Sequence, residues 1–341
     1  MAVVEQTVLE ALKGVIDPNT GRDFVSSKAV KNLTVTDGDV AFDVTLGYPA
    51  KSQIPGFRKE LIAAAKSVAG VANVSVNIVT NITAHAVQRG VALLPKVKNI
   101  VAVASGKGGV GKSTVASNLA VALSQSGLRV GLCDCDLYGP SIAHMFGTDE
   151  RPYQNDEQQI VPIEKHGLQL MSMGFLLEDA SPVIVRGPIA TRYTQQFLRQ
   201  CAWNDLDVLV LDLPPGTGDI QLTIVQTVSL DGAVIVTTPQ EVALIDARKA
   251  VGMFQKVNVP ILGIIENMSY FLCPSDGKVY HIFGKGGGEH EAKRLGVPLL
   301  GQIPIEMDVR ESGDEGHPIA LEDPAKSASS KVFREIAAQL R

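Results

Sequence analysis

The sequence predicts an α/β protein with a doubly wound, mainly parallel sheet, preceded by a small α/β domain. From residue 98 onward, short β-rich runs alternate with helical patterns, which is typical of a parallel sheet with helices on both faces. The first run, 98–104, leads into a glycine-rich stretch and then a helical pattern at 113–126. We expect a small domain at 1–83, a linker at 84–97, where no clear period is present, and a large domain at 98–341.

Length and composition limit the class of protein. The chain has 341 residues, of which 45% are hydrophobic and 20% charged, which suits two globular domains and excludes disordered and collagen-like chains. No run of about 18 apolar residues occurs, and the N-terminus lacks the basic start and apolar core of a secretion signal. We therefore expect a cytoplasmic protein that does not associate with membranes. The formal net charge of −5 argues against nucleic acid as a partner.

The cysteines are too few and too scattered for a disulfide framework, so we expect reduced thiols. They are Cys133, Cys135, Cys201 and Cys273. For the C-x-C formed by Cys133 and Cys135, a buried position in the core is the favoured interpretation, because free cysteine often behaves as a small apolar residue.

The small domain is predicted to run helix, strand, strand, helix, strand. Apolar residues at helical spacing predict a first helix that stops at Asp17-Pro18; they are Val8, Leu9, Leu12, Val15 and Ile16. Asp37-Gly38 between the first two strands is a strong hairpin signal. The remaining elements are strands at 29–36 and 40–46, a helix at 56–68 that ends before Gly70, and a strand at 74–82.

The large domain continues the alternation to its C-terminal end. Residues 129–133 predict a second strand, 159–171 suggest a hairpin, and 183–203 contain a helix. The apolar run 206–211 predicts a fully buried strand. Further strands are predicted at 233–237, 259–265 and 298–303, and further helices at 241–256, 289–295 and 325–340, the last of them with a structural role.

A phosphate-binding loop lies between the first strand and the first helix of the large domain. Gly106, Gly111, Lys112 and Ser113 match the pattern G-x-x-x-x-G-K-[ST] of P-loop NTPases. Glycines let backbone N–H groups turn inward around a polyphosphate, toward which the helix directs the positive end of its dipole. Lys112 is expected to bind the β- and γ-phosphates and Ser113 to bind Mg²⁺. The neighbouring Gly108, Gly109, Val110 and Thr114 complete the predicted nucleotide-binding loop.

Three aspartates follow predicted strands of the same sheet. Asp134 and Asp136 lie at or just beyond the end of the second strand, and Asp212 ends the apolar run at 206–211. In open parallel sheets, ligands bind at the carboxyl ends of strands, so these carboxylates should face the phosphates. Ser113 with either Asp134 or Asp212 is expected to fix Mg²⁺, which leaves Asp136 for the attacking water. A helix-capping role is the alternative for the aspartates that follow the second strand.

Lys107 adds a second lysine to the loop, giving GKGGVGKST, and the motifs DCDLYGPS, DLPPGTGD and IFGKGGG follow it. With these motifs the large domain resembles the deviant Walker A ATPases, the class of the nitrogenase iron protein, MinD and ParA. Within that class it resembles the Mrp/ApbC group of iron–sulfur cluster carrier proteins. The resemblance implies a homodimer in which Lys107 reaches the nucleotide of the opposite subunit. It also implies that Asn267 contacts the base, that Arg310 lies near the adenine pocket, and that Asp136 orients the water.

The resemblance further implies partners that are iron–sulfur scaffolds or apo-target proteins, and a [4Fe–4S] cluster as cargo. Members that hold this cluster have a C-x-x-C pair after the strand that ends in Asn, whereas this chain has Cys273-Pro274-Ser275-Asp276. Cys273 is therefore a candidate cluster ligand, and Asp276 is a less suitable oxygen ligand. An ATP-switched regulatory or partitioning protein that carries no cluster is the alternative function.

Residues 1–83 resemble the small domain of SufT/PaaD-type iron–sulfur assembly factors. Asp17, Pro18, Gly21 and Asp23 match the opening turn of that domain. Members with a reactive cysteine have it after the second strand, but here that segment reads GYPAKSQIP, so no thiol chemistry is expected. For Asp17 and Asp23, helix termination and loop hydrogen bonding are the favoured roles.

Overall fold

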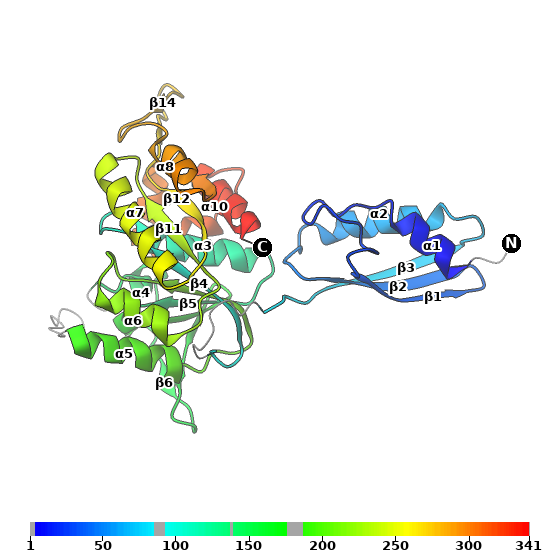
Figure 1. Ribbon diagram of the computed structural model, residues 1–341, viewed down its shortest axis with the longest axis horizontal. Coiled ribbons are helices and arrows are strands. Elements are labelled where there is room, and N and C mark those ends of the chain that lie inside the picture. The colour runs from blue at the N-terminus through cyan, green and yellow to red at the C-terminus, as the bar shows by residue number, and fades with distance from the viewer. Residues whose placement is uncertain (1–3, 85–92, 137–138, 176–186, 341) are drawn as a thin grey trace. The chain divides into compact units, whose positions relative to one another are not determined.

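The computed structural model describes residues 4–84, 93–136, 139–175 and 187–340. The chain divides into two compact units, Met1–Thr83 and Ala84–Arg341, which are treated separately below (Figure 1). Most of the predicted linker, 85–92, lies outside the described residues. Leu94, near its end, is buried in the core of the larger unit, where the first strand begins at Val97.

The smaller unit packs two helices against a three-stranded sheet (Figure 1). Its elements are α1 (Glu5–Leu12), β1 (Val30–Thr36), β2 (Asp39–Leu46), α2 (Ile54–Lys66) and β3 (Asn73–Thr80). β1 pairs antiparallel with β2, and β2 pairs parallel with β3. Alternate residues of β2 are buried, because each strand turns every second side chain toward the helices. The predicted order of elements is therefore confirmed.

The ends of both helices in this unit differ from the prediction. α1 stops at Leu12, not at Asp17-Pro18, and Ile16 is 53% exposed. Ile16 is drawn out of the helix because its backbone pairs with that of Asp23 across the following loop. α2 ends at Lys66, where the N–H of Ser67 bonds back to Ala63 and Ala64, so Gly70 lies in the turn beyond the helix.

The loop after α1 is organised by two aspartates. Buried Asp17 accepts hydrogen bonds from the backbone N–H of Asn19 at 2.9 Å, the Thr20 hydroxyl at 2.9 Å and the Tyr48 hydroxyl at 2.8 Å. Asp23 accepts from the N–H groups of Ser26 and Val25, and the hydrogen bond from Ser26 lowers its pKa. Both carboxylates therefore form the loop hydrogen bonds that the sequence predicts, whereas the predicted helix termination at Asp17 is wrong, because α1 already ends at Leu12.

The larger unit is built on an eight-stranded sheet in the order β15-β12-β11-β4-β10-β5-β9-β8. All neighbouring pairs are parallel except β8 and β9, which form the predicted hairpin. The strands are β4 (Val97–Ala104), β5 (Val130–Asp134), β8 (Ile163–Lys165), β9 (Leu168–Ser172), β10 (Leu206–Asp212), β11 (Gly232–Thr237), β12 (Ile261–Glu266) and β15 (Leu299–Gln302). Two further hairpins lie outside this sheet, formed by β6 (Tyr153–Gln154) with β7 (Ile160–Val161) and β13 (Phe271–Leu272) with β14 (Val279–Tyr280).

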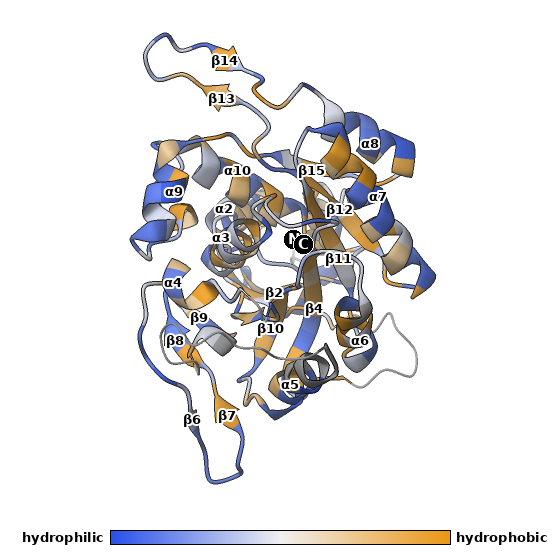
Figure 2. Cartoon of the chain, turned by 90° about the vertical axis from the view of Figure 1, so that its left-hand side faces the viewer, coloured by the Kyte–Doolittle hydropathy of each residue, from blue (hydrophilic) through white to orange (hydrophobic). Residues whose placement is uncertain are grey.

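Helices cover both faces of this sheet (Figure 2). They are α3 (Lys112–Gln125), α4 (Ile142–Met145), α5 (Gly187–Gln200), α6 (Asp219–Thr227), α7 (Glu241–Lys256), α8 (Gly287–Leu295), α9 (Met307–Asp314) and α10 (Ala328–Gln339), with short 3₁₀ turns η1 (Met173–Phe175) and η2 (Ile319–Leu321). Residues of α5, α6, α7 and α8 share one apolar cluster with Ala102, Leu209 and Ile235 of the central strands. Every residue of β5, β10 and β11 is buried, as a parallel sheet between two layers of helices requires. No described helix has both the length and the apolar character needed to cross a membrane.

A network of charged residues lies at the amino ends of the central strands, at the edge of the sheet opposite the phosphate loop. Asp207, near the start of β10, accepts from Lys98 Nζ at 3.0 Å, from the backbone N–H of Arg129 at 3.0 Å and from Arg129 Nε and Nη2 at 3.1 and 3.0 Å. Burial raises the pKa of Asp207, but the hydrogen bonds from Arg129 and Lys98 outweigh it and lower the pKa to about 2.

Asp207→Asn is expected to lower the free energy of unfolding of the larger unit by about 2 kcal/mol at pH 7, since hydrogen bonds to a charged group are lost in a buried position. Because the pKa in the folded state lies below the ordinary 3.8, the stabilising effect is complete above about pH 4 and disappears as the pH falls toward 2. Urea unfolding at pH 7 and near pH 3 measures this, and the difference between wild type and variant should shrink at the lower pH. Asp205→Asn is the matched control. The Asp205 side chain is 65% exposed and its ion pair with Arg129 Nη1 is long, at 4.0 Å, so this variant should change the free energy of unfolding little.

Candidate functional site

The glycine-rich loop joins the end of β4 to the start of α3, at the centre of the sheet. Two of its glycines are required by the fold. A Cβ atom at Gly106 would lie 2.1 Å from the backbone of Asp246 in α7, and one at Gly111 would lie 2.3 Å from Asn267 Nδ2. Gly111 also has a φ of +79°, which a residue with a side chain rarely adopts. The loop is thus wedged between α7 and the end of β12.

Lys112, the first residue of α3, is 6% exposed and forms an ion pair with Asp212 at the end of β10. Its Nζ also donates to Ser113 Oγ at 3.1 Å. Three predicted site residues from two elements are therefore brought together at the carboxyl edge of the sheet, where strands β4 and β10 are neighbours. The positive charge of the loop lysine has a buried counterion on the neighbouring strand.

One carboxylate oxygen of Asp212 accepts no hydrogen bond from the described residues. The residue is fully buried, and its Oδ2 has no hydrogen-bond partner among the described residues. Burial raises the pKa of the Asp212 carboxyl, although the charge of Lys112 acts in the opposite direction. A buried carboxylate oxygen and the Ser113 hydroxyl are hard oxygen donors, which suit Mg²⁺ together with phosphate oxygens and water. The residues present therefore fit a magnesium ion.

Asp134 holds the segment that follows β5. Its Oδ1 accepts from the backbone N–H of Asp136 at 3.0 Å, and its Oδ2 accepts from the Ser141 N–H at 3.1 Å and the Ser172 hydroxyl at 3.0 Å. Burial, and next the charge of Asp212, raise the pKa of Asp134 to about 7. Both oxygens of Asp134 thus accept hydrogen bonds, from Asp136, Ser141 and Ser172, whereas Oδ2 of Asp212 accepts none from the described residues.

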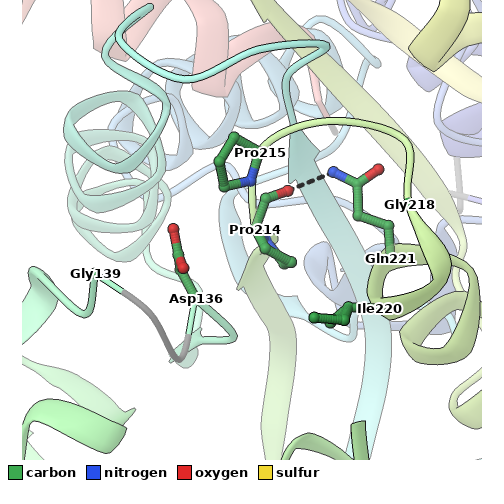
Figure 3. A pocket seen from close by; sticks show the side chains of 7 residues that line it. All are labelled: Asp136, Gly139, Pro214, Pro215, Gly218, Ile220 and Gln221. Carbon is green, nitrogen blue, oxygen red and sulfur yellow. Dashed lines mark hydrogen bonds between the residues drawn. The ribbon is translucent and has the colours of Figure 1, made fainter. Parts of the chain in front are cut away.

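Asp136 lines a cavity of about 470 Å³ beside the loop that follows β10. Figure 3 shows its carboxylate facing Pro214 and Pro215 across this cavity. The Gln221 side chain donates to the carbonyl of Pro214, and the N–H of Gly216 donates to the carbonyl of Ser105 at the base of the phosphate loop, at 3.0 Å. The DLPPGTGD segment is therefore attached to both α6 and the phosphate loop. The two residues after Asp136, 137 and 138, lie outside the described part of the chain.

The remaining residues that are predicted to contact nucleotide differ in their surroundings. Asn267 is buried, and its Nδ2 donates to the carbonyl of Val110 at 2.9 Å, so it supports the loop directly. Arg310 is at the surface of α9, 66% exposed, and forms ion pairs with Asp314 and Glu311, both at 2.8 Å. Lys107 is half-buried and forms no ion pair within the described residues.

The other members of the predicted loop divide by exposure. Gly108 and Gly109 are exposed and Val110 is buried, while Ser113 and Thr114 are half-buried at the start of α3. The apolar side chain of Val110 therefore attaches the loop to the protein interior, and the backbone of the two glycines is exposed to solvent.

Cys273 lies in the hairpin of β13 and β14, which projects from the body of the larger unit (Figure 2). It is half-buried, and its Sγ lies 3.0 Å from Ser275 Oγ. Asp276 accepts from the backbone N–H of Lys278 at 2.9 Å and from the Tyr280 hydroxyl at 2.8 Å, and the first of these lowers its pKa. The carboxylate that stands where a second cysteine is expected is thus already engaged within the hairpin.

The other three cysteines, Cys133, Cys135 and Cys201, are buried in the core, as predicted for the C-x-C pair. Burial raises the pKa of the Cys201 thiol, which keeps it protonated and unreactive. Within the described ranges, no three or more His, Cys, Asp or Glu side chains are grouped so that they could hold a metal ion.

Sequence reasoning missed three residues that build this region, Gln221, Ser172 and Glu266. The first two are polar residues without a motif. Gln221 donates to Pro214, 7 residues earlier in the chain, and Ser172 donates to Asp134 from a segment 38 residues away. Glu266 carried a signal, because a charged residue ends the otherwise apolar run IIE before Asn267. It is completely buried and accepts hydrogen bonds from Ser269 and Gln302.

Comparison with known proteins decides the family. The family model described as "NUBPL iron-transfer P-loop NTPase" matches residues 96–341, and a second, described as "Iron-sulfur cluster assembly protein", matches residues 5–77. The chain belongs to the NUBPL iron-transfer P-loop NTPase family. The resemblance to iron–sulfur cluster carriers, the P-loop NTPase fold and the separate small domain are thereby confirmed.

Curated relatives agree over most of the chain. An iron-sulfur cluster carrier protein of Synechocystis is 44% identical over 338 residues, which are 98% of this chain and 96% of the relative. One of Pseudomonas fragi is 52% identical over 270 residues, 79% of this chain and 94% of the relative. Among solved structures, the nucleotide-binding protein of Archaeoglobus fulgidus in complex with ADP has a TM-score of 0.60 at 39% identity, covering 67% of this chain and 90% of that one. The cell division ATPase MinD of Pyrococcus furiosus has a TM-score of 0.54 at 26% identity, covering 71% and 98%.

Proposed function

We propose that this NUBPL-family protein is a Mg²⁺-dependent ATPase that acts as a homodimer and delivers iron–sulfur clusters to apo-proteins. The observation that carries the proposal is the grouping of Lys112, Ser113 and Asp212 at the end of the glycine-rich loop. This grouping supplies a lysine for phosphate, a hydroxyl and a carboxylate oxygen for Mg²⁺, and a helix N-terminus.

Each residue of the site has a role in this proposal. Lys112 and the loop N–H groups bind the β- and γ-phosphates, and Asn267 and Arg310 lie toward the base. Ser113 and Asp212 would hold Mg²⁺, which neutralises charge that develops on the phosphates. Asp136 orients the attacking water from the edge of the cavity shown in Figure 3.

Two further residues complete the proposed site. Asp134 keeps the segment that carries Asp136 in place, through its hydrogen bonds to that segment. Lys107 acts on the nucleotide bound by the second subunit. Its lack of an ion pair within the described residues supports a role toward a group from outside the subunit.

The proposed cargo is a [4Fe–4S] cluster, bound through Cys273. A homodimer supplies two Cys273 thiolates, which is half of the usual set of four, so a scaffold or an apo-target protein would supply further ligands. The four free thiols fit a reducing cytoplasm, which is the location we propose.

Cys273→Ser is expected to remove most of the iron that the protein binds, because a hydroxyl is a poor ligand for a cluster compared with a thiolate. The measurement is iron and sulfide per protomer after anaerobic reconstitution with Fe²⁺ and sulfide. Cys201→Ala is the matched control, since this buried cysteine should not contribute. Equal iron in wild type and Cys273→Ser would remove Cys273 as a ligand.

That result would favour the second candidate function, an ATP-switched regulatory protein that carries no cluster. The observation in its favour is Asp276, which stands in the position of the second cysteine and is held by Tyr280 and Lys278. In that case ATP hydrolysis should remain, and partner binding should depend on ATP in the iron-free protein.

A further inference from the structure

A four-residue turn connects the phosphate loop to the hairpin that carries Cys273. It comprises residues 266–269, from the last residue of β12 to the start of the segment that leads into β13. At one end of the turn, Asn267 Nδ2 donates to the carbonyl of Val110 in the phosphate loop at 2.9 Å. At the other end, Ser269 lies four residues before Cys273. The 266–269 turn therefore connects the two sites, through a hydrogen bond to the phosphate loop at one end and through the peptide chain to Cys273 at the other.

Glu266 fixes this turn from inside the protein. Its carboxylate is completely buried and accepts from Ser269 Oγ at 2.6 Å, from Gln302 Nε2 at 2.8 Å and from the N–H of Gly288. A Cβ atom at Gly288 would lie 2.6 Å from Glu266 Oε2, so the start of α8 packs directly on the carboxylate. A buried charge held by three donors resists displacement, because losing any donor leaves charge uncompensated.

Met268, between these two contacts, has a φ of +54°. A residue with a side chain adopts this conformation only when its surroundings impose it, and such strain is concentrated at functional sites. Here the neighbours impose it, since the N–H of Asn267 donates to Thr237 at 2.8 Å and the N–H of Ser269 donates to Ile303 at 2.9 Å. The turn therefore has little freedom to absorb a displacement of Asn267 without moving Ser269.

The hairpin beyond the turn has few backbone contacts with the rest of the larger unit. Within the described part of the chain, its strands pair only with each other, apart from contacts of Tyr270 and Phe271 with Ile305 at its base. An isolated two-stranded hairpin is only marginally stable in water. Changes at the base will therefore alter how well the segment around Cys273 is ordered.

We propose that the 266–269 turn transmits occupancy of the phosphate loop to the Cys273 thiol, so that bound nucleotide changes the reactivity of this cysteine. The proposal rests on the nucleotide site proposed above and adds a means of regulating the cysteine. Bound nucleotide holds the phosphate loop in place, and with it Asn267. Because Asn267 belongs to the turn, the turn and the base of the hairpin become more ordered, and the Cys273 thiol becomes less accessible.

The test measures alkylation of Cys273 in the reduced, iron-free, full-length protein. N-ethylmaleimide reaches this thiol selectively because the other three cysteines are buried, and Cys273→Ser gives the background rate. Mg²⁺ with ADP, or with a non-hydrolysable ATP analogue, should slow alkylation by about threefold or more relative to the nucleotide-free protein, within the range of such couplings. Ser269→Ala, which removes the hydrogen bond to Glu266, should bring the ratio of the two rates close to one.

A control variant, a second test variant and a binding measurement separate the outcomes. Ser330→Ala removes another buried serine hydroxyl, which donates to the Glu322 carbonyl at 2.8 Å, and should leave the ratio as in wild type. Met268→Gly relieves the strained φ and should weaken the effect without disturbing the fold. Nucleotide affinity, measured with a fluorescent ADP, should be unchanged in Ser269→Ala.

Wild-type protein that binds nucleotide with no change in alkylation rate would overturn the inference and leave the proposed ATPase intact. A wild-type ratio that persists in both Ser269→Ala and Met268→Gly would also overturn it, because the effect would then travel by another route. Protein that binds no nucleotide would instead contradict the proposed function itself.

Discussion

Lys112→Met is expected to lower ATP turnover by about 10²- to 10³-fold and to weaken nucleotide binding, the largest effect we expect of any single change in this chain. The variant removes the lysine at the N-terminus of α3, which pairs with Asp212 at the end of β10. This is where the β- and γ-phosphates are proposed to bind. Methionine keeps most of the side-chain volume while it removes the charge. The measurement is phosphate release with Mg²⁺ and ATP, together with titration of a fluorescent nucleotide.

The ion pair with Asp212 requires a second variant. Loss of Lys112 leaves a buried carboxylate without its counterion, which costs about 3 kcal/mol or more in comparable buried pairs. Lys112→Met combined with Asp212→Asn removes both charges, so it should recover thermal stability but not turnover. Lys293→Met is a matched control, since its ion pair with Glu289 is on the surface, and its turnover should equal that of wild type. Wild-type turnover in Lys112→Met would exclude the loop as the ATPase site.

Asp136→Ala is expected to bind ATP but to hydrolyse it about 10²-fold more slowly, or worse, because positioning and activation of the attacking water are lost. The carboxylate lies at the rim of the cavity beside Pro214 and Pro215, opposite the segment tied to the phosphate loop (Figure 3). Lys112 forms its ion pair with Asp212, which the Asp136→Ala variant retains, so nucleotide binding should survive. Single-turnover kinetics and nucleotide titration separate the two quantities.

A stability measurement completes that test. The backbone N–H of Asp136, rather than its side chain, donates to Asp134, so alanine preserves this contact. The melting temperature should therefore be close to that of wild type. Asp134→Ala should behave differently, because it removes the acceptor for Asp136, Ser141 and Ser172, and should lose stability as well as activity. Normal turnover in Asp136→Ala would remove this residue from the mechanism.

The sequence predicts the phosphate loop from residues that are adjacent in the chain, and it predicts Asp134, Asp136 and Asp212 from their places after strands. Lys112 and Ser113 follow the loop glycines directly, and the strand before and the helix after the loop are both visible as patterns. The choice between Asp134 and Asp212 stayed open, because it depends on Ser141 and Ser172, which donate to Oδ2 of Asp134 from other segments, while the N–H of Asp136 donates to Oδ1.

Contacts that no local sequence pattern indicates explain the remaining differences as well. The support that Asn267 gives to Val110 crosses 157 residues of sequence, and no local pattern indicates it. In the small unit, α1 was predicted too long because Ile16 fits the helical spacing, yet its pairing with Asp23 takes it into the loop. The order of strands and helices in the small unit was predicted, since each element carries its own period, whereas α6, α9 and the β13–β14 hairpin of the larger unit were not predicted.

The ion pair between Lys112 and Asp212 also bears on which anions the phosphate loop accepts. A free inorganic phosphate could reach Lys112 only by separating a buried pair and leaving Asp212 without a partner. A polyphosphate that arrives with a divalent cation replaces both partners at once, because phosphate takes the lysine and the cation takes the carboxylate. We therefore expect the loop to bind inorganic phosphate weakly, and its affinity for nucleotide and for Mg²⁺ to rise and fall together.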